Sequence, residues 1–82
     1  MFQDPLTLYK LIVLYMLNKV SFPLSSSQIG DFILEKDYTN FLTLQQVFSD
    51  LKNNNLIAAK TGRNRTLFSI TAEGMNTLSY FE

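Results

Sequence analysis

A signal for the start of a helix occurs twice in this chain, and it constrains the fold more than any other feature. Ser25 is followed three residues later by Gln28, and Thr43 by Gln46, so each pair can exchange side chain to backbone hydrogen bonds as a capping box. Apolar residues also flank each pair at the positions of a hydrophobic staple: Leu24 with Ile29, and Leu42 with Val47. We therefore expect two helices in succession, over about residues 25–36 and 43–54, joined by a turn over residues 37–42.

The second of these helices carries a clean apolar stripe. Its members recur at the i, i+3, i+4 and i+7 spacing of a helix that is buried on one side. They are Leu44, Val47, Phe48 and Leu51. Asn55 tolerates left-handed backbone geometry, so we expect it to end this helix.

A long apolar segment precedes the pair of helices. Asp4 and Pro5 form a typical helix start, since Asp accepts bonds from free first-turn amides and Pro at the first position loses no partner. The helix expected over residues 5–19 is apolar on nearly every side, which is more than one core can cover. Its longest apolar run, Leu11 to Leu17, is far shorter than the ~20 residues that span a bilayer, so we expect no membrane segment.

The rest of the chain predicts short strands and one more helix. Residues 20–24 form a short strand or connector, because the residue before Pro23 favours extended geometry. Residues 56–60 and 65–70 have strand length and are joined by a link that contains Gly, as in a hairpin. Thr71 then caps a last helix in which Met75 and Leu78 face one side. The fold class is therefore α+β, with one domain over residues 1–82, since 82 residues do not fill a second core.

Composition excludes several kinds of function. The chain has no Cys and no His, so disulfides, thiol nucleophiles, His-based acid–base chemistry and the usual zinc ligand sets are absent. Asp31 and Glu35 are four residues apart on a helix and form a solvated face rather than a catalytic pair. We expect no enzyme, no metal and no cofactor, and the lack of Cys and of a secretory leader favours the cytoplasm.

Charge is distributed unevenly along a chain whose net charge is zero. Residues 1–50 hold three Lys and five acids, whereas residues 51–72 hold four cations and no acid. Residues 73–82 add two acids. The basic charge is thus confined to the predicted hairpin and the residues around it.

In this order, the elements resemble a winged helix-turn-helix domain in which the hairpin is the wing. The ending Phe68 to Gly74 resembles the last wing strand and capped C-terminal helix of PadR-like and MarR-like bacterial regulators. The stretch Asp4 to Tyr15, with Thr43 to Gln46, more closely resembles the N-terminal domain of an uncharacterised bacterial domain-of-unknown-function family of presumed transcriptional regulators. Members of that family carry a further C-terminal domain, so the chain is either whole or the N-terminal part of a longer protein.

The resemblance implies that this is the DNA-binding domain of a bacterial transcriptional regulator. The helix over residues 43–54 would enter the major groove, and the wing over residues 60–65 would lie on the backbone or in the minor groove. Gln and Asn can read adenine edges, and Arg is favoured near phosphates and in the minor groove. The candidate residues for double-stranded DNA are Thr43, Gln45, Gln46, Ser49, Asn53, Lys60, Arg63, Asn64 and Arg65.

The alternative is a winged-helix module for protein interaction or dimerisation with little DNA affinity, which the zero net charge favours. The polar helix face is then an ordinary solvated face, and the wing cations only blunt an edge strand. In either case the excess apolar surface predicts a homodimer through the first and last helices, or contact with a missing C-terminal domain. The candidate interface residues are Tyr9, Val13, Leu14, Leu78, Tyr80 and Phe81.

Overall fold

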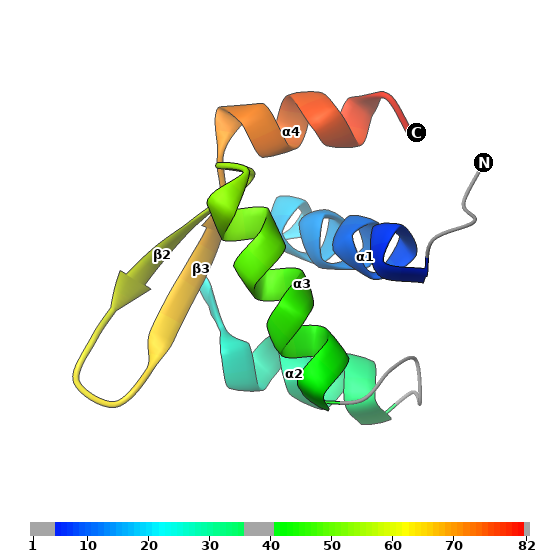
Figure 1. Cartoon of the computed structure of the whole chain (residues 1–82). Coiled ribbons are helices and arrows are strands. Elements are labelled where there is room, and N and C mark those ends of the chain that lie inside the picture. Colours follow the sequence, from blue (N-terminus) through cyan, green and yellow to red (C-terminus); the bar gives the residue numbers. More distant parts are fainter. Residues whose placement is uncertain (1–4, 36–40, 82) are drawn as a thin grey trace.

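The described part of the chain, residues 5–35 and 41–81 of a computed structural model, contains four helices and a three-stranded antiparallel sheet (Figure 1). The predicted α+β class and the predicted order of elements are confirmed. In chain order the elements are α1 (Pro5–Lys19), β1 (Leu24–Ser25), α2 (Ser26–Glu35), α3 (Phe41–Asn53), β2 (Ile57–Thr61), β3 (Thr66–Ile70) and α4 (Ala72–Ser79).

The sheet has the strand order β1-β3-β2, so β3 lies in the centre. β2 pairs with β3 from Ile57↔Ile70 to Thr61↔Thr66, and this hairpin projects from the body of the molecule as the wing (Figure 1). The amide of Gly62 donates to the carbonyl of Arg65 at 2.7 Å and closes the loop. The first strand is shorter and later than predicted, because Pro23 has no amide to donate and pairing begins at Leu24.

The first capping box is present. The amide of Ser25 donates to Gln28 Oε1 at 2.8 Å, and the amide of Gln28 donates to Ser25 Oγ at 3.1 Å. Leu24 and Ile29 are both buried, as the predicted staple requires. The start of α2 therefore follows from its local sequence.

The second capping box, at Thr43, was predicted wrongly. α3 already begins at Phe41, so Thr43 lies within its first turn. Leu42 is 79% exposed and does not form the predicted staple with Val47. The longer helix keeps the same apolar stripe towards the core, so core packing does not oppose the earlier start of α3. Of the predicted turn over residues 37–42, residues 37–40 lie outside the described part of the structure.

Each helix and each strand contributes to the core. The buried hydrophobic residues among those described are Val13, Leu14, Leu17, Leu24, Ile29, Ile33, Leu44, Val47, Phe48, Leu51, Ile57, Phe68 and Leu78. The whole predicted stripe of α3 is included. Met75 is exposed, however, so the predicted shared face of Met75 and Leu78 on α4 is wrong for Met75.

The core also corrects the predicted dimer interface. Val13 and Leu14 are 0% and 1% exposed, and Leu78 is 4% exposed, so these three side chains pack inside their own domain. The physical reason is that α1 has two apolar faces, and the face that holds Val13 and Leu14 is the one turned inward. Val13 and Leu14 have no surface left to offer a second copy, and Leu78 has very little.

The end of α3 is joined to the start of α4. Asn55 has φ of 62°, in the left-handed region, and ends α3 as predicted. Thr71 is the N-cap of α4, as predicted, and its hydroxyl accepts from the amide of Gly74 at 2.9 Å. The same hydroxyl donates to the carbonyl of Asn55 at 2.7 Å. One side chain thus fixes both helix ends beside the base of the wing.

Candidate nucleic-acid interface

The outer face of α3 is polar. Because Leu44, Val47, Phe48 and Leu51 occupy one side of the helix, polar residues emerge on the opposite side. Four of the predicted DNA-binding residues are exposed there, and Thr43 is half-buried in the first turn. The exposed four are Gln45, Gln46, Ser49 and Asn53.

A polar groove of about 250 Å³ separates α3 from the wing. Gln45, Ser49 and Lys52 line it from the helix, and Thr61 and Thr66 line it from the two strands. Ser26, in the first turn of α2, also lines this groove, and no acidic side chain is among its described lining residues. The groove therefore offers hydroxyls, an amide and one cation to whatever occupies it.

The base of this groove is a pair of stacked aromatic rings. Phe48 of α3 and Phe68 of β3 have ring centroids 4.8 Å apart and an angle of 28° between ring planes. Both side chains are buried. The stack fixes α3 against the central strand, and it thereby sets the position of the helix relative to the wing.

Four polar lining residues were not among the predicted site residues, namely Ser26, Lys52, Thr61 and Thr66. Lys52 lies beside the apolar stripe on α3, so on the helix alone it looks peripheral. The wing lies on that side of the helix, so the fold places Lys52 in the polar groove. Thr61 and Thr66 are polar residues at strand ends, and only their pairing across the hairpin brings them together. Local sequence signals do not contain this information.

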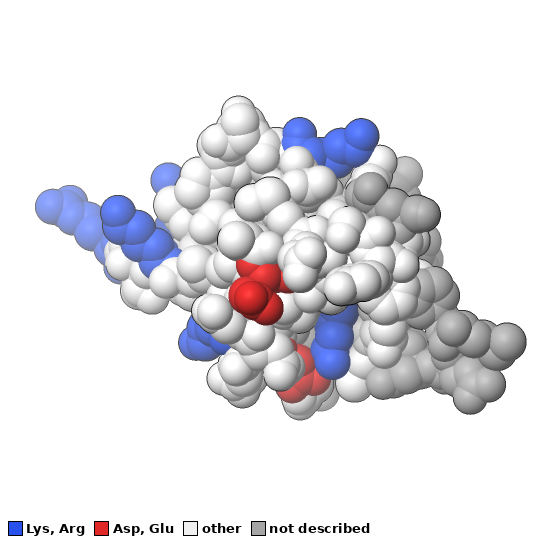
Figure 2. Space-filling view, turned by 90° about the horizontal axis from the view of Figure 1, so that it is seen from above, with Lys and Arg blue, Asp and Glu red and all other residues white. Residues whose placement is uncertain are grey.

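The tip of the wing carries exposed polar and basic residues. Arg63, Asn64 and Arg65 lie in the loop between β2 and β3, and all three are exposed. Side chains alternate along a strand, and Ala59 and Thr61 line the groove, so Lys60 points from the other face of the wing. Figure 2 shows Lys and Arg side chains on the projecting wing, whereas the acids visible in that view lie on the body.

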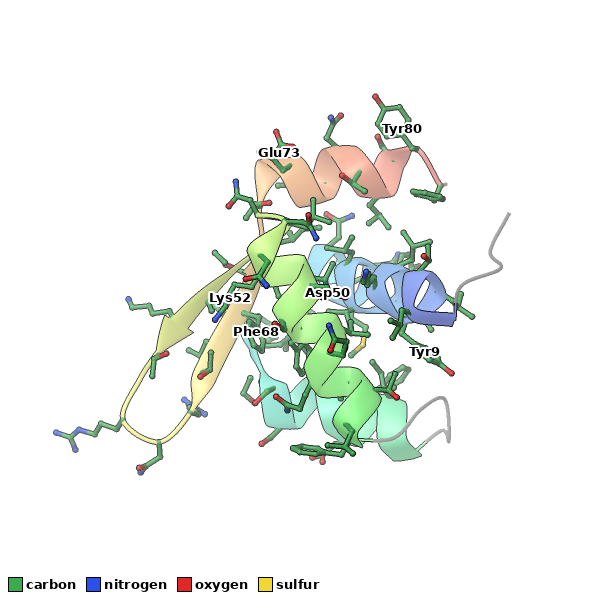
Figure 3. All side chains as sticks on the ribbon, viewed as in Figure 1. Tyr9, Asp50, Lys52, Phe68, Glu73 and Tyr80 are labelled. Atoms are coloured by element: carbon green, nitrogen blue, oxygen red, sulfur yellow. The ribbon has the colours of Figure 1, made fainter. Side chains whose placement is uncertain are left out.

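Asp50 is the acidic residue of α3, and it lies on the flank away from the wing. Figure 3 shows Asp50 and Lys52 on opposite sides of the helix. Lys10 of α1 neutralises Asp50, with 3.3 Å between Lys10 Nζ and Asp50 Oδ2. Gln46 donates from Nε2 to Asp50 Oδ1 at 2.8 Å. The acid therefore faces α1 and does not interrupt the polar groove.

Residues 9–82 match the family model described as Domain of unknown function (DUF4364). The chain belongs to this DUF4364 family. It also resembles a solved transcriptional regulator from Clostridium thermocellum, with a TM-score of 0.74 and 23% sequence identity. That match covers 88% of this chain and 76% of the regulator, and it shows that the two share a fold. The comparison with curated proteins gives no match.

A second surface of this DUF4364 chain is apolar. The side of α1 opposite its buried face lines a groove of about 610 Å³ with Leu8, Leu11, Ile12 and Tyr15. α2 contributes the exposed Phe32, and the C-terminal end contributes Leu78 and Phe81. These α1 residues follow the i, i+3, i+4 and i+7 spacing. The buried residues of α1 lie between them in the sequence, so the sequence alone does not show two separate stripes.

The predicted interface residues match this apolar groove only in part. Leu78 and Phe81 line it, although Leu78 is buried, whereas Tyr9 and Tyr80 are not among its lining residues. Tyr80 is 80% exposed and points away from the body, on a different side of the molecule from Tyr9 (Figure 3). Phe81 is the one predicted residue that is both exposed and in the groove.

Two other kinds of site are absent from residues 5–35 and 41–81 of the DUF4364 domain. No helix in this part is long and apolar enough to cross a membrane. Within the same part, no group of three or more Cys, His, Asp or Glu side chains could hold a metal ion.

Proposed function

We propose that this domain binds double-stranded DNA as part of a bacterial transcriptional regulator. The polar groove between α3 and the wing carries this proposal, because Lys52 lines it from the helix and the exposed Arg63 and Arg65 lie in the wing loop beyond its lining residues. Phosphate binding needs cations and hydrogen-bond donors in one continuous path, and Ser49, Thr61 and Thr66 add hydroxyl donors to it. One DNA strand would lie along this path.

In this arrangement α3 lies in the major groove. Its exposed side chains are amides and a hydroxyl, which hydrogen-bond to base edges rather than attract phosphates. The wing contributes Arg63 and Arg65 to the backbone or to the adjacent minor groove, where Arg is favoured. The shared fold with a transcriptional regulator supports the same role. This role requires no catalysis and no cofactor, and it places the protein in the cytoplasm.

The test is the salt dependence of binding to a labelled 20-bp random-sequence duplex, measured by fluorescence anisotropy. Replacing Arg63 with Ala should weaken binding to all duplexes alike and lower the slope of log K against log salt by about one unit. Glu73→Gln is the control, because it changes one charge on α4, outside both grooves. If the parent does not bind even at low salt, or if both variants change the slope equally, the proposal is wrong.

The apolar groove favours a second role, which is pairing with another copy of the chain. Its stripe on α1 has the spacing of a helix that packs against another helix. In a two-fold dimer the same stripe meets itself, so each copy covers the other's exposed Leu8, Tyr15 and Phe81. The stripe lies on the side of α1 away from α3, so such a dimer leaves the polar groove free. A C-terminal domain of a longer chain is the alternative occupant.

A further inference from the structure

Three side chains connect α1 to the outer face of α3. Lys10 Nζ lies 3.3 Å from Asp50 Oδ2, and Asp50 Oδ1 accepts from Gln46 Nε2 at 2.8 Å. The side chains of Lys10 and Asp50 are each 27% exposed, whereas Gln46 lies on the exposed face of α3. The connection therefore runs from a largely covered ion pair to a residue that can touch DNA.

This connection fixes which way the amide of Gln46 faces. A carboxylate only accepts hydrogen bonds, so the amide nitrogen, and not the oxygen, must point towards Asp50. The torsion that turns a Gln amide is otherwise broad and roughly two-fold, so an unheld amide presents either end. Lys10 holds the Asp50 carboxylate in place through a charge-assisted contact. Gln46 is left with its oxygen and one N–H for a ligand.

We propose that Lys10 and Asp50 are positioning residues that make Gln46 select adenine over guanine; this rests on the proposed function. In the major groove adenine offers the N6 amino group and the N7 acceptor, which match the free oxygen and N–H of Gln46. Guanine has O6 where adenine has N6, so its oxygen would face the oxygen of Gln46. Turning the amide to suit guanine would break the bond to Asp50.

The experiment is selection of bound sequences from a pool of random 20-bp duplexes, followed by sequencing. Gln46→Ala first identifies the position at which its loss removes the preference. At that position we expect Lys10→Met to lower the preference for adenine over guanine by about tenfold, the scale of one good bidentate contact. Glu73→Gln changes one charge outside both grooves and should leave the preference unchanged. Lys10→Arg restores a cation and should keep it.

Two further variants separate positioning from a general loss of structure. Asp50→Ala breaks the connection at its other end and should reduce the same preference at the same position. In the double variant Lys10→Met with Gln46→Ala, no further loss is expected, because the effect of Lys10 passes through Gln46. A preference ratio is measured on DNA bound by folded protein, so a lower folded fraction does not change it.

The outcomes distinguish this inference from the proposed function. If Gln46→Ala removes a preference that Lys10→Met and Asp50→Ala both retain, the positioning role is wrong and DNA binding stands. If Gln46→Ala leaves every position unchanged, Gln46 does not read a base and the inference is overturned. If the parent binds no duplex at low salt, the proposed function and this inference are both wrong.

Discussion

Gly74, at the start of α4, lies where the chain leaves no room for a side chain. A Cβ atom there would collide with the carbonyl oxygen of Leu56 and with the side chain of Ile70. Because the nearest atom belongs to the backbone, it cannot move aside as a flexible side chain would. We expect Gly74→Ala to lower the free energy of unfolding by ~3 kcal/mol, measured by urea denaturation with circular dichroism.

Gly30, on α2, provides the matched control. A Cβ atom at this position would lie 3.5 Å from Leu44 Cδ2, which is an ordinary van der Waals contact. Ala is also a better helix former than Gly, so Gly30→Ala should raise stability by roughly 0.5–1 kcal/mol. Equal effects of the two substitutions would show that the close approach at Gly74 does not exist.

Single residues differ in how far their sequence predicts their place. Asn55 and Thr71 were predicted correctly, because left-handed geometry and helix capping depend on the chemistry of the residue itself. Val13 and Leu14 were assigned to the wrong surface. α1 is apolar on two faces, and which face turns inward is decided by the elements that pack on it rather than by α1.

The helices show how the same signal can succeed once and fail once. Before Ser25 the chain is held as strand, with Leu24 paired to Phe68, so α2 cannot extend towards its N-terminus. Before Thr43, the two described residues Phe41 and Leu42 are helical rather than paired in the sheet, and α3 includes both. A capping box therefore marks a helix start only where something else stops the helix.

The contact between α3 and β3 gives a test at the level of these elements. Phe48→Ala removes one ring of the stack with Phe68 and opens a cavity, so we expect a loss of ~3–5 kcal/mol in unfolding free energy. Domains of this size have only about 5–15 kcal/mol in total, so the variant should be partly unfolded at room temperature. Thermal melting followed by circular dichroism measures the effect.

Phe48→Leu is the comparison for that variant. It keeps an apolar side chain in the core, so the loss should stay below about 2 kcal/mol. If the Phe48→Ala protein melts like the parent, Phe48 of α3 does not pack against the wing strand β3 as described. Other residues would then have to form the base of the polar groove.

For the molecule as a whole, the proposed pairing of two chains predicts a change in mass. Tyr15 is exposed in the apolar groove, so Tyr15→Glu should leave the monomer folded and place a charge in the dimer contact. Sedimentation equilibrium at high micromolar concentration should find a dimer for the parent and a monomer for this variant. Leu42→Glu, on exposed α3 surface outside that groove, should remain a dimer. If the parent is strictly monomeric, a second copy of the chain does not occupy the apolar groove.

The architecture was more predictable than the site. Apolar spacing and turn residues predicted every element and their order, because each depends on neighbours in sequence. The polar groove combines Ser26, Lys52, Thr61 and Thr66 from four elements, and no local pattern connects them. The apolar groove was anticipated as an excess of apolar surface, and of the predicted interface residues only Leu78 and Phe81 line it, whereas none of those predicted on α1 does.

The projecting wing also affects how the molecule meets a charged partner. The chain has no net charge, but Lys60, Arg63 and Arg65 are all exposed at the wing, whereas Asp50 and Glu73 belong to the body. Such a molecule is an electric dipole, and a polyanion turns it so that the wing approaches first. The rate of encounter should therefore fall as ionic strength rises, although a neutral sphere would show no such dependence.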